Sequence, residues 1–491
     1  MDHPDTPVHH RPAVELAAMI AAREISSREL LEHFVSRIES LDPVTNAVVT
    51  LDLDRARDAA DAADAATVTG SAVGPFHGLP VTVKDALAVE GVRSTGGAVE
   101  LADHVATADA DVVALVRGAG AIPFAKTNVP RWSGDLQTFN EVFGTTNNPW
   151  DASRTPGGSS GGPAASVALG FTGFELGTDI GGSIRVPAAY NGIAGHKPSY
   201  GLVPCGGYID RVDYGRTEPD INVHGPLARS VDDLEVLMDV LAAPRPERAI
   251  AVTHRMPPAR HDRIDDYRIA VWPDHDGCRA SADTVAAVES AGDTLVSLGA
   301  RVDRNARPAL DATEAAALGL WLVAGATSPS LTDDEFAFYT ALAASADTPD
   351  EIRSAISTFT ATPREWFAAD VRRAHVREAW REFFGEVDAL VCPVIVTPPF
   401  AHVQEGNVST RTLPVDGVER PYTDLLHWTV LIGMAYLPAT VVPVATTADG
   451  LPVAVQIVGP YMEDRTPMAV ARALRTELGP MEFPDAPRAA N

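Results

Sequence analysis

The chain has 491 residues, of which 45% are apolar and 21% charged, and its formal net charge is −27. This composition is typical of a globular protein with a sizeable core. No run of 18 uninterrupted apolar residues predicts a membrane span. The negative charge repels phosphate backbones, so we expect no nucleic-acid partner, and without such a span we expect no membrane partner.

The N-terminus and the cysteines indicate the cellular compartment. The N-terminus lacks the cationic start and apolar core of a signal peptide. Three scattered cysteines, Cys205, Cys278 and Cys392, match neither a disulfide framework nor a metal site. Both observations predict a cytoplasmic protein.

The first 70 residues are expected to form an N-terminal helical segment. Ser26 and Glu29 make a capping box, and apolar residues then recur at helical spacing up to Leu41. We predict that this helix ends before Pro43. A short strand at 48–51 and an exposed helix at 54–66 follow.

In residues 71–244 the sequence pattern changes, and predicted helices alternate with predicted strands. A helix that stops at a glycine and leads into a strand is the mark of an α/β layer fold. The predicted elements here are strands at 78–85, 122–126 and 171–176, and helices at 109–117, 160–169 and 230–241.

Residues 245–425 are predicted to be a mainly helical lobe with some strands, and residues 426–491 to return to the core sheet. Two strands, 438–444 and 451–458, flank a turn with Asp449-Gly450, which predicts a hairpin. Strand signals therefore lie on both sides of the helical lobe. We expect an α/β fold with one large mixed sheet, to which both halves of the chain contribute strands.

Base usage singles out three positions. The chain has 36 arginines but only three lysines, Lys84, Lys126 and Lys197. A buried lysine can lose its proton, whereas an arginine effectively cannot. Lys84 ends an apolar strand, so it is either a surface residue with its ammonium in water or a buried base with a lowered pKa.

Two serines lie in glycine-rich loops. Ser183 follows Gly181-Gly182, and the N–H groups of such a loop can form an oxyanion hole. A structural turn or an anion-binding loop is the alternative. Ser159 matches G-x-S-x-G, but a loop rather than a strand precedes it, which disfavours a nucleophile elbow. A phosphate-binding helix start is also possible at Ser159, although the nucleotide-binding loop motif is absent.

Histidine and metal chemistry are less favoured. Of 14 histidines only His196 lies in the glycine-rich stretch, so a Ser-His-Asp triad has little support. No H-E-x-x-H motif and no pair of cysteines at ligand spacing occurs. We therefore expect neither a metal nor an organic cofactor.

Taken together, the motifs resemble those of the amidase signature family. The two serine motifs lie 24 residues apart, and Val83-Lys84-Asp85 fits the lysine motif. Matching segments run along most of the chain. They are 157–162, 177–187, 195–198, 126–128, 140–144, 148–149, 438–439 and 450–459.

The resemblance implies an α/β/α fold and a Ser-Ser-Lys triad in an amide hydrolase that forms an acyl-enzyme. Ser183 would be the nucleophile, Ser159 the middle serine, preceded by a cis peptide bond, and Lys84 the terminal base. The remaining implied residues are the oxyanion hole, Ile180, Gly181, Gly182 and Ser183, and the site supports, Asp179, Arg185 and Ser160.

The substrate is less determined. Trp132, Leu136, Phe139 and Tyr208 fall in or near segments that could line a pocket, which favours a small aryl or hydrophobic acyl amide; they could equally be core residues. A carbamate or urea-type substrate fits the same chemistry.

A rival is the glutaminase subunit of a tRNA-dependent amidotransferase, which the negative charge and the segment 201–207 disfavour. A catalytically inactive binding protein is disfavoured by the intact triad. We expect a small-molecule substrate and a monomer or homodimer.

Overall fold

The computed structural model describes residues 6–210, 215, 217–328, 331–348, 353, 356–406 and 408–489. Its centre is an eight-stranded mixed sheet in the order β10-β9-β11-β15-β14-β7-β8-β6. The strands β10, β9 and β11 are parallel, and every later neighbour in the order is antiparallel. The bounds are β6 Glu175–Asp179, β7 Ala194–Lys197, β8 Val223–Ala228, β9 Arg268–Val271, β10 Arg301–Asp303, β11 Ala389–Pro393, β14 Ala439–Thr446 and β15 Pro452–Val458.

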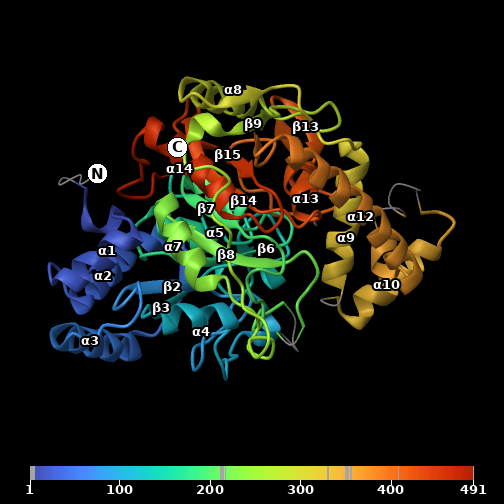
Figure 1. The fold of residues 1–491 in the computed structure, drawn as a ribbon. Helices are drawn as coiled ribbons and strands as arrows, with labels where there is room; N and C mark the ends of the chain where they lie inside the picture. The colour runs from blue at the N-terminus through green and yellow to red at the C-terminus, as the bar shows by residue number, and fades with distance from the viewer. Residues whose placement is uncertain are drawn as a thin grey trace.

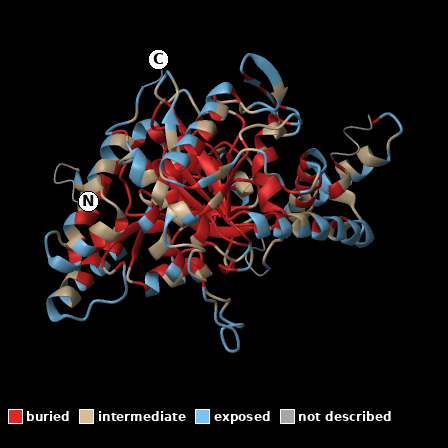
Figure 2. Ribbon diagram, turned by 45° about the horizontal axis from the view of Figure 1, so that its top comes forward, coloured by how far each residue is buried: buried red, intermediate tan, exposed pale blue. Residues whose placement is uncertain are grey.

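Helices cover both faces of this sheet, as its side-chain alternation requires. On β15, Val455 and Ile457 belong to one apolar cluster, and Ala454 and Val458 belong to the other. Successive strand residues point to opposite faces, so each face needs its own cover. Helices α7 Val231–Leu241, α8 Ala282–Ser297 and α14 Arg465–Leu478 contact the strands of this sheet on the first face. Helices α1 Ala13–Ala22, α2 Ser27–Thr45 and α4 Asp111–Gly118 belong to the same apolar cluster. The second face carries α5 Gly161–Ala168, α6 Arg185–Asn191, α9 Ala312–Thr327, α12 Pro363–Glu386 and α13 His427–Gly433. The fold is therefore α/β/α, with the buried core between the helical layers (Figure 2).

The strand that carries Lys84 is not part of the large sheet. It is β2 (Pro80–Lys84), which forms a separate three-stranded sheet in the order β1-β3-β2. Here β1 is Val48–Leu51 and β3 is Ile122–Thr127, with β3 antiparallel to β1 and parallel to β2. Helix α3 (Leu53–Thr69) follows β1. The expectation of a single large sheet is thus correct for both halves of the chain but not for the lysine strand.

Helices α9, α10 (Asp333–Ala344) and α12 form a protrusion at the right of Figure 1. Thr362 and Glu365 form a capping box at the start of α12. The strands β9 and β10, which come before this protrusion, extend the large sheet, so the segment 245–425 contains both helices and strands. The small hairpins are β4 Phe139–Asn140 with β5 Gly144–Thr145, and β12 Thr412–Val415 with β13 Val418–Pro421. The short 3₁₀ segments are η1 Val8–His10, η2 Val99–Leu101, η3 Arg131–Ser133, η4 Ile264–Asp266, η6 Ser357–Thr360 and η7 Tyr422–Leu426.

Two boundary predictions are wrong. Helix α2 continues through Pro43 to Thr45, because a proline in the last turn removes only one backbone hydrogen bond. The helix ends at Asn46, whose backbone lies in the left-handed region. The strand predicted at 171–176 is instead β6 at Glu175–Asp179, where Gly177 lies opposite Gly225 on β8. A Gly-Thr-Asp segment reads as a loop in sequence, and pairing with β8 overrides that preference.

None of the helices in the described part of the chain combines the length and the apolar character that a membrane span needs.

Candidate active site

Lys84 lies at the carboxyl end of β2 with its side chain fully buried. Its Nζ donates to three hydroxyl oxygens: Ser159 Oγ and Thr178 Oγ1, both at 2.7 Å, and Ser160 Oγ at 3.0 Å. Burial lowers the pKa of Lys84 to about 7, while the negative charges of Asp179 and Glu175 oppose that shift. A neutral amine surrounded by hydroxyls can accept a proton from one of them, which is what a general base must do.

Ser159 belongs to a tightly packed glycine loop in front of α5. A Cβ atom at Gly158 would lie 2.6 to 2.7 Å from backbone atoms of Asp135 and Gln137, so only glycine fits there. The peptide bond between Gly158 and Ser159 is cis, as the resemblance implies. Ser160 N–H donates to the carbonyl oxygen of Ser183 at 3.2 Å, which ties the two serine loops together.

Ser183 lies in the turn between β6 and α6 and is 6% exposed. Gly182, which precedes it, has φ of +123°, a conformation that favours glycine. Gly182 N–H donates to Asp179 Oδ1 at 2.8 Å, so this N–H, expected in the oxyanion hole, is already bonded. The N–H groups of Ile180, Gly181 and Ser183 donate to no other group within the described part of the chain, so they remain available to a substrate oxygen.

Asp179 and Arg185 form a fully buried ion pair beneath the Ser183 turn. The Asp179 carboxylate accepts from the N–H groups of Gly182, Ile184 and Arg185 and from two nitrogens of the Arg185 guanidinium. Burial alone would raise the pKa of Asp179, but Arg185 lowers it to about 2. The carboxylate is therefore ionised over the whole working pH range and holds the turn in place.

The residues predicted to line a pocket are only partly exposed. Leu136 and Tyr208 are buried in the core, whereas Trp132 and Phe139 are half-buried. Tyr208 lies beside Thr178, and burial raises its pKa to about 12. Two apolar residues not identified from sequence, Val323 on α9 and Leu426 on η7, lie against the Ser183 turn: a Cβ atom at Gly181 would be 3.9 and 3.1 Å from their side chains.

The structure adds three polar residues that sequence reasoning missed. Thr178 bonds the lysine, Glu175 bonds its backbone, and His224 lies on β8 opposite Thr178. Burial and the neighbouring Lys84 lower the pKa of His224 to about 3. Thr178 lies in the matching segment 177–187, although no role was assigned to it there. No motif flags Glu175 or His224, because each reaches Lys84 from a strand more than 90 residues away.

The histidine and the two lysines considered as alternatives have structural partners. His196 lies between Asp464 and Thr440, with both ring nitrogens engaged, so it is not a base for Ser183. Lys197 donates to the carbonyl oxygens of Pro198 and Leu437, and Lys126 donates to that of Leu87 and to Ser94 Oγ.

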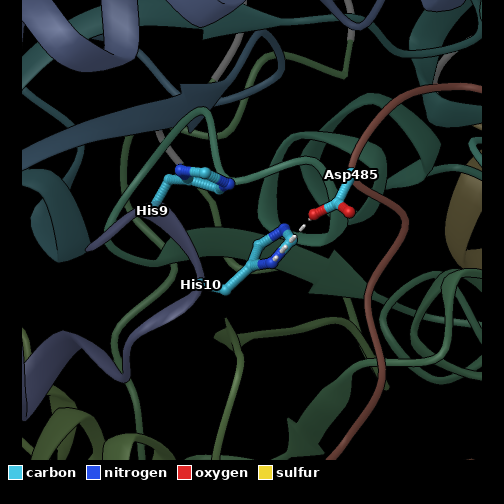
Figure 3. Close-up of side chains that lie close together, drawn as sticks. All are labelled: His9, His10 and Asp485. Carbon is cyan, nitrogen blue, oxygen red and sulfur yellow. Dashed lines mark ion pairs between the residues drawn. The ribbon is translucent and has the colours of Figure 1, made fainter. Parts of the chain in front are cut away.

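One cluster in the described residues has the composition of a metal site: His9, His10 and Asp485, where the two chain ends meet (Figure 3). His10 Nδ1 lies 3.9 Å from Asp485 Oδ1. Burial, together with the charges of Arg37 and Arg229, lowers the pKa values of His9 and His10 to about 3 and about 4. The charges of Arg37 and Arg229, which act on both histidines, would also repel a cation, so we assign no metal to this cluster.

The geometry brings a buried lysine, two serine loops and a glycine turn with available N–H groups together in one place. The family model described as Amidase matches residues 29–467, and the chain belongs to the amidase signature family. It is therefore a hydrolase of this family that acts on carbon–nitrogen bonds.

The relatives carry different activities in their names. The chain is 32% identical to a Glutamyl-tRNA(Gln) amidotransferase subunit from Acidothermus cellulolyticus, over 97% of both chains. The structure of a bacterial aryl acylamidase of the amidase signature family superposes with a TM-score of 0.80 at 26% identity, covering 96% of this chain and 97% of that one. A structure described as an unexpected vestigial protein complex that reveals the evolutionary origins of an s-triazine catabolic enzyme has a TM-score of 0.81 at 26% identity, covering 96% of this chain and all of the other.

Proposed function

We propose that the protein hydrolyses a small amide with an aryl or apolar acyl group through an acyl-enzyme on Ser183. The observation that carries the proposal is the bond between the buried Lys84 amine and Ser159 Oγ, beside the glycine turn that presents Ser183. Neutral Lys84 takes a proton from Ser159, and Ser159 takes one from Ser183. The Ser183 oxygen then attacks the substrate carbonyl carbon.

The same relay supports the second half of the reaction. The oxyanion of the tetrahedral intermediate would lie against the N–H groups of Ile180, Gly181 and Ser183, and Asp179 would keep that turn rigid. The proton held by the relay passes to the leaving nitrogen, because an amine leaves far more easily than its anion. Water then hydrolyses the ester at Ser183 and regenerates the three residues. No metal or cofactor is needed for these steps.

The preference for an apolar substrate rests on the surroundings of the turn. Ile180, Val323 and Leu426 are half-buried apolar side chains at or against it. An apolar group of the substrate would bury the exposed parts of these side chains, which favours binding by about 25 cal/mol per Å² of apolar surface buried. A carbamate with an apolar substituent would fit the same wall.

A second candidate is glutamine hydrolysis as the glutaminase subunit of a tRNA-dependent amidotransferase, which the names of the relatives at 32–33% identity favour. That role would require partner proteins and proximity to tRNA. The net charge of −27 opposes a tRNA surface, and the apolar wall offers no charge to the polar groups of glutamine.

A substrate panel on the purified chain tests the proposal. It contains a chromogenic anilide, an aliphatic primary amide, an aryl carbamate and glutamine, each assayed with the wild type and with Ser183→Ala. We expect the wild type to turn over the anilide fastest and Ser183→Ala to be inactive on every substrate. Glutamine turnover with an inert anilide would favour the second candidate, and activity retained in Ser183→Ala would refute the nucleophile.

A further inference from the structure

The base and the nucleophile come from different sheets. Lys84 is the last residue of β2 in the three-stranded sheet, and Ser183 follows β6, the edge strand of the eight-stranded sheet. No backbone ladder joins β2 to β6 among the described strand pairs. One backbone bond crosses this seam at the other end of β2, from Gly173 N–H to the carbonyl oxygen of Pro80 at 3.3 Å. At the Lys84 end, the distance between the lysine amine and the serines must be fixed by side chains.

Glu175, the first residue of β6, crosses the seam with a fully buried side chain. Its Oε2 accepts from the Lys84 backbone N–H at 3.1 Å, and from its neighbour Leu176 N–H at 2.8 Å. Its Oε1 accepts from Thr82 Oγ1 at 2.8 Å and from Thr127 Oγ1 at 2.7 Å. Three of the four donors thus belong to β2 and β3, so one carboxylate takes the place of the missing backbone ladder.

Thr172, which lies just before β6, adds a weaker bond to the same strand. Its hydroxyl oxygen accepts the backbone N–H of Thr82 at 2.9 Å. That bond lies two residues before Lys84 and involves no charge. Glu175 is the group that reaches the backbone of the lysine itself, and hydrogen bonds to a carboxylate are about twice as strong as neutral ones.

We propose that Glu175 is a positioning residue for Lys84: its carboxylate fixes the end of β2 against β6 so that the lysine amine meets Ser159 and Thr178. This rests on the proposed function, in which Lys84 is the base. Glu175 has no contact with the serines among its hydrogen bonds, so it acts through the lysine and not on the substrate.

The surrounding charges define what each substitution would change. Lys84 on β2 and Lys126 on β3 face Glu175, and Asp179 on β6 and His224 on β8 face Lys84. A glutamine at position 175 keeps the shape and can still accept from Lys84 N–H, while its amide group donates to Thr82 and Thr127, whose hydroxyls can accept. Glu175→Gln therefore removes charge and keeps geometry, whereas Glu175→Ala removes both.

The experiment measures kcat, KM and the pH profile of anilide hydrolysis for Glu175→Gln and Glu175→Ala. For Glu175→Ala we expect kcat to fall by about 100-fold, the cost of a displacement of roughly 1 Å in a catalytic group, with KM changed by less than about threefold. For Glu175→Gln we expect a loss of less than about tenfold and a shift of the acidic limb of kcat/KM to lower pH by about one unit, because an anion near Lys84 is lost.

Asp42→Asn is the matched control. Asp42 is also a buried carboxylate that accepts two backbone N–H groups, those of Ala47 and Val48, but it joins α2 to β1. We expect this variant to lose stability and keep the wild-type kcat and pH limb. If Glu175→Ala does not fold, Thr127→Val, which removes one donor to Glu175, replaces it and should lower kcat with KM unchanged.

The outcomes separate the two proposals. The positioning role is overturned if a folded Glu175→Ala or Thr127→Val keeps the wild-type kcat and the acidic limb of kcat/KM in Glu175→Gln stays at the wild-type pH. Ser183→Ala would still be inactive in that case. A wild type that hydrolyses no member of the panel refutes the proposed function instead.

Discussion

Lys84 is buried among hydroxyl groups, with its Nζ bonded to no carboxylate. This is the residue-scale feature on which the proposed chemistry depends. Desolvation disfavours the ammonium, so the pKa falls to about 7 even though Asp179 and Glu175 oppose the shift. A lysine in such a place can be neutral near pH 7, which an arginine could not be.

The pH dependence of the reaction follows from this pKa. The base is active when deprotonated, so kcat/KM for the anilide should rise about tenfold per pH unit below pH 7 and level off above about pH 8. His224, whose pKa is lowered to about 3, does not titrate in that window. Glu175 does, since burial raises its pKa to about 7, and the Glu175→Gln profile separates the two groups. A profile that is flat or falling between pH 5.5 and 8 would contradict the assignment of Lys84 as the base.

Lys84→Ala should affect two substrates differently. Anilide hydrolysis needs a proton delivered to the leaving nitrogen, so kcat should fall by about 10² to 10⁴-fold, the range of general acid–base catalysis. A nitrophenyl ester has a leaving group that needs no proton, so its loss should be at least about tenfold smaller. The ratio of the two rates is an internal control, because misfolding would lower both equally. An equal loss on ester and anilide would contradict the role of Lys84 in delivering a proton to the leaving nitrogen.

At the scale of elements, the structure depends on glycine where loops meet. The loop of Ser159 packs against the backbone of residues 135–137, and Gly158 is the closest contact. The glycine pattern makes this loop recognisable in sequence. The contact itself is not predictable, because it joins the loop to a segment more than 20 residues earlier that has no regular structure.

Gly158→Ala should therefore inactivate the enzyme. The added Cβ atom would lie 2.6 Å from two backbone carbonyl oxygens, a distance that only movement of the backbone can relieve. We expect a loss of stability of about 1–3 kcal/mol from overpacking, measured by urea unfolding, and loss of anilide turnover. Gly385 in α12 is the matched control, because a Cβ atom there meets nothing within 4 Å. Gly385→Ala should be neutral or stabilising by up to about 1 kcal/mol, with full activity. Full activity in a folded Gly158→Ala would show that the loop can shift freely.

Sequence predicted the helix and strand elements best where the pattern is local. Ser26 with Glu29 predicted the start of α2, and Asp449-Gly450 predicted the hairpin of β14 and β15, both of which are present. The placement of β2 in its own sheet was not predictable, because periodicity reveals a strand but not its partners. Glu175 was missed for the same reason: inside an apolar strand it reads as an edge residue, and only the seam between two sheets explains its burial.

At the scale of the whole molecule, all three lysines are buried and have lowered pKa values. These are about 7 for Lys84, about 8 for Lys126 and about 7 for Lys197, and burial is the main cause in each. In the unfolded chain each lysine titrates near 10.4. Between about pH 8 and 10 the three lysines of the unfolded chain thus bind more protons than those of the folded one, and their contribution makes the free energy of unfolding rise with pH. Each lysine that stays neutral in the fold contributes about 1.4 kcal/mol per pH unit.

The three cysteines limit this rise. All are buried and free, and burial raises their pKa values in the fold, whereas in the unfolded chain they titrate near 8.5. Above that pH the unfolded chain gains stability by releasing thiol protons, which offsets the lysines. We therefore predict that the free energy of unfolding in urea rises from pH 7.5 to about 8.5 and then changes little up to pH 9.5. Lys126→Met should reduce the rise, since one titrating amine is lost. If the thiols are chemically blocked in the unfolded chain, they no longer titrate, and the rise should extend to higher pH. A free energy of unfolding that falls between pH 7.5 and 8.5 would mean that the buried lysines are charged in the folded protein, and with them the base of the proposed mechanism.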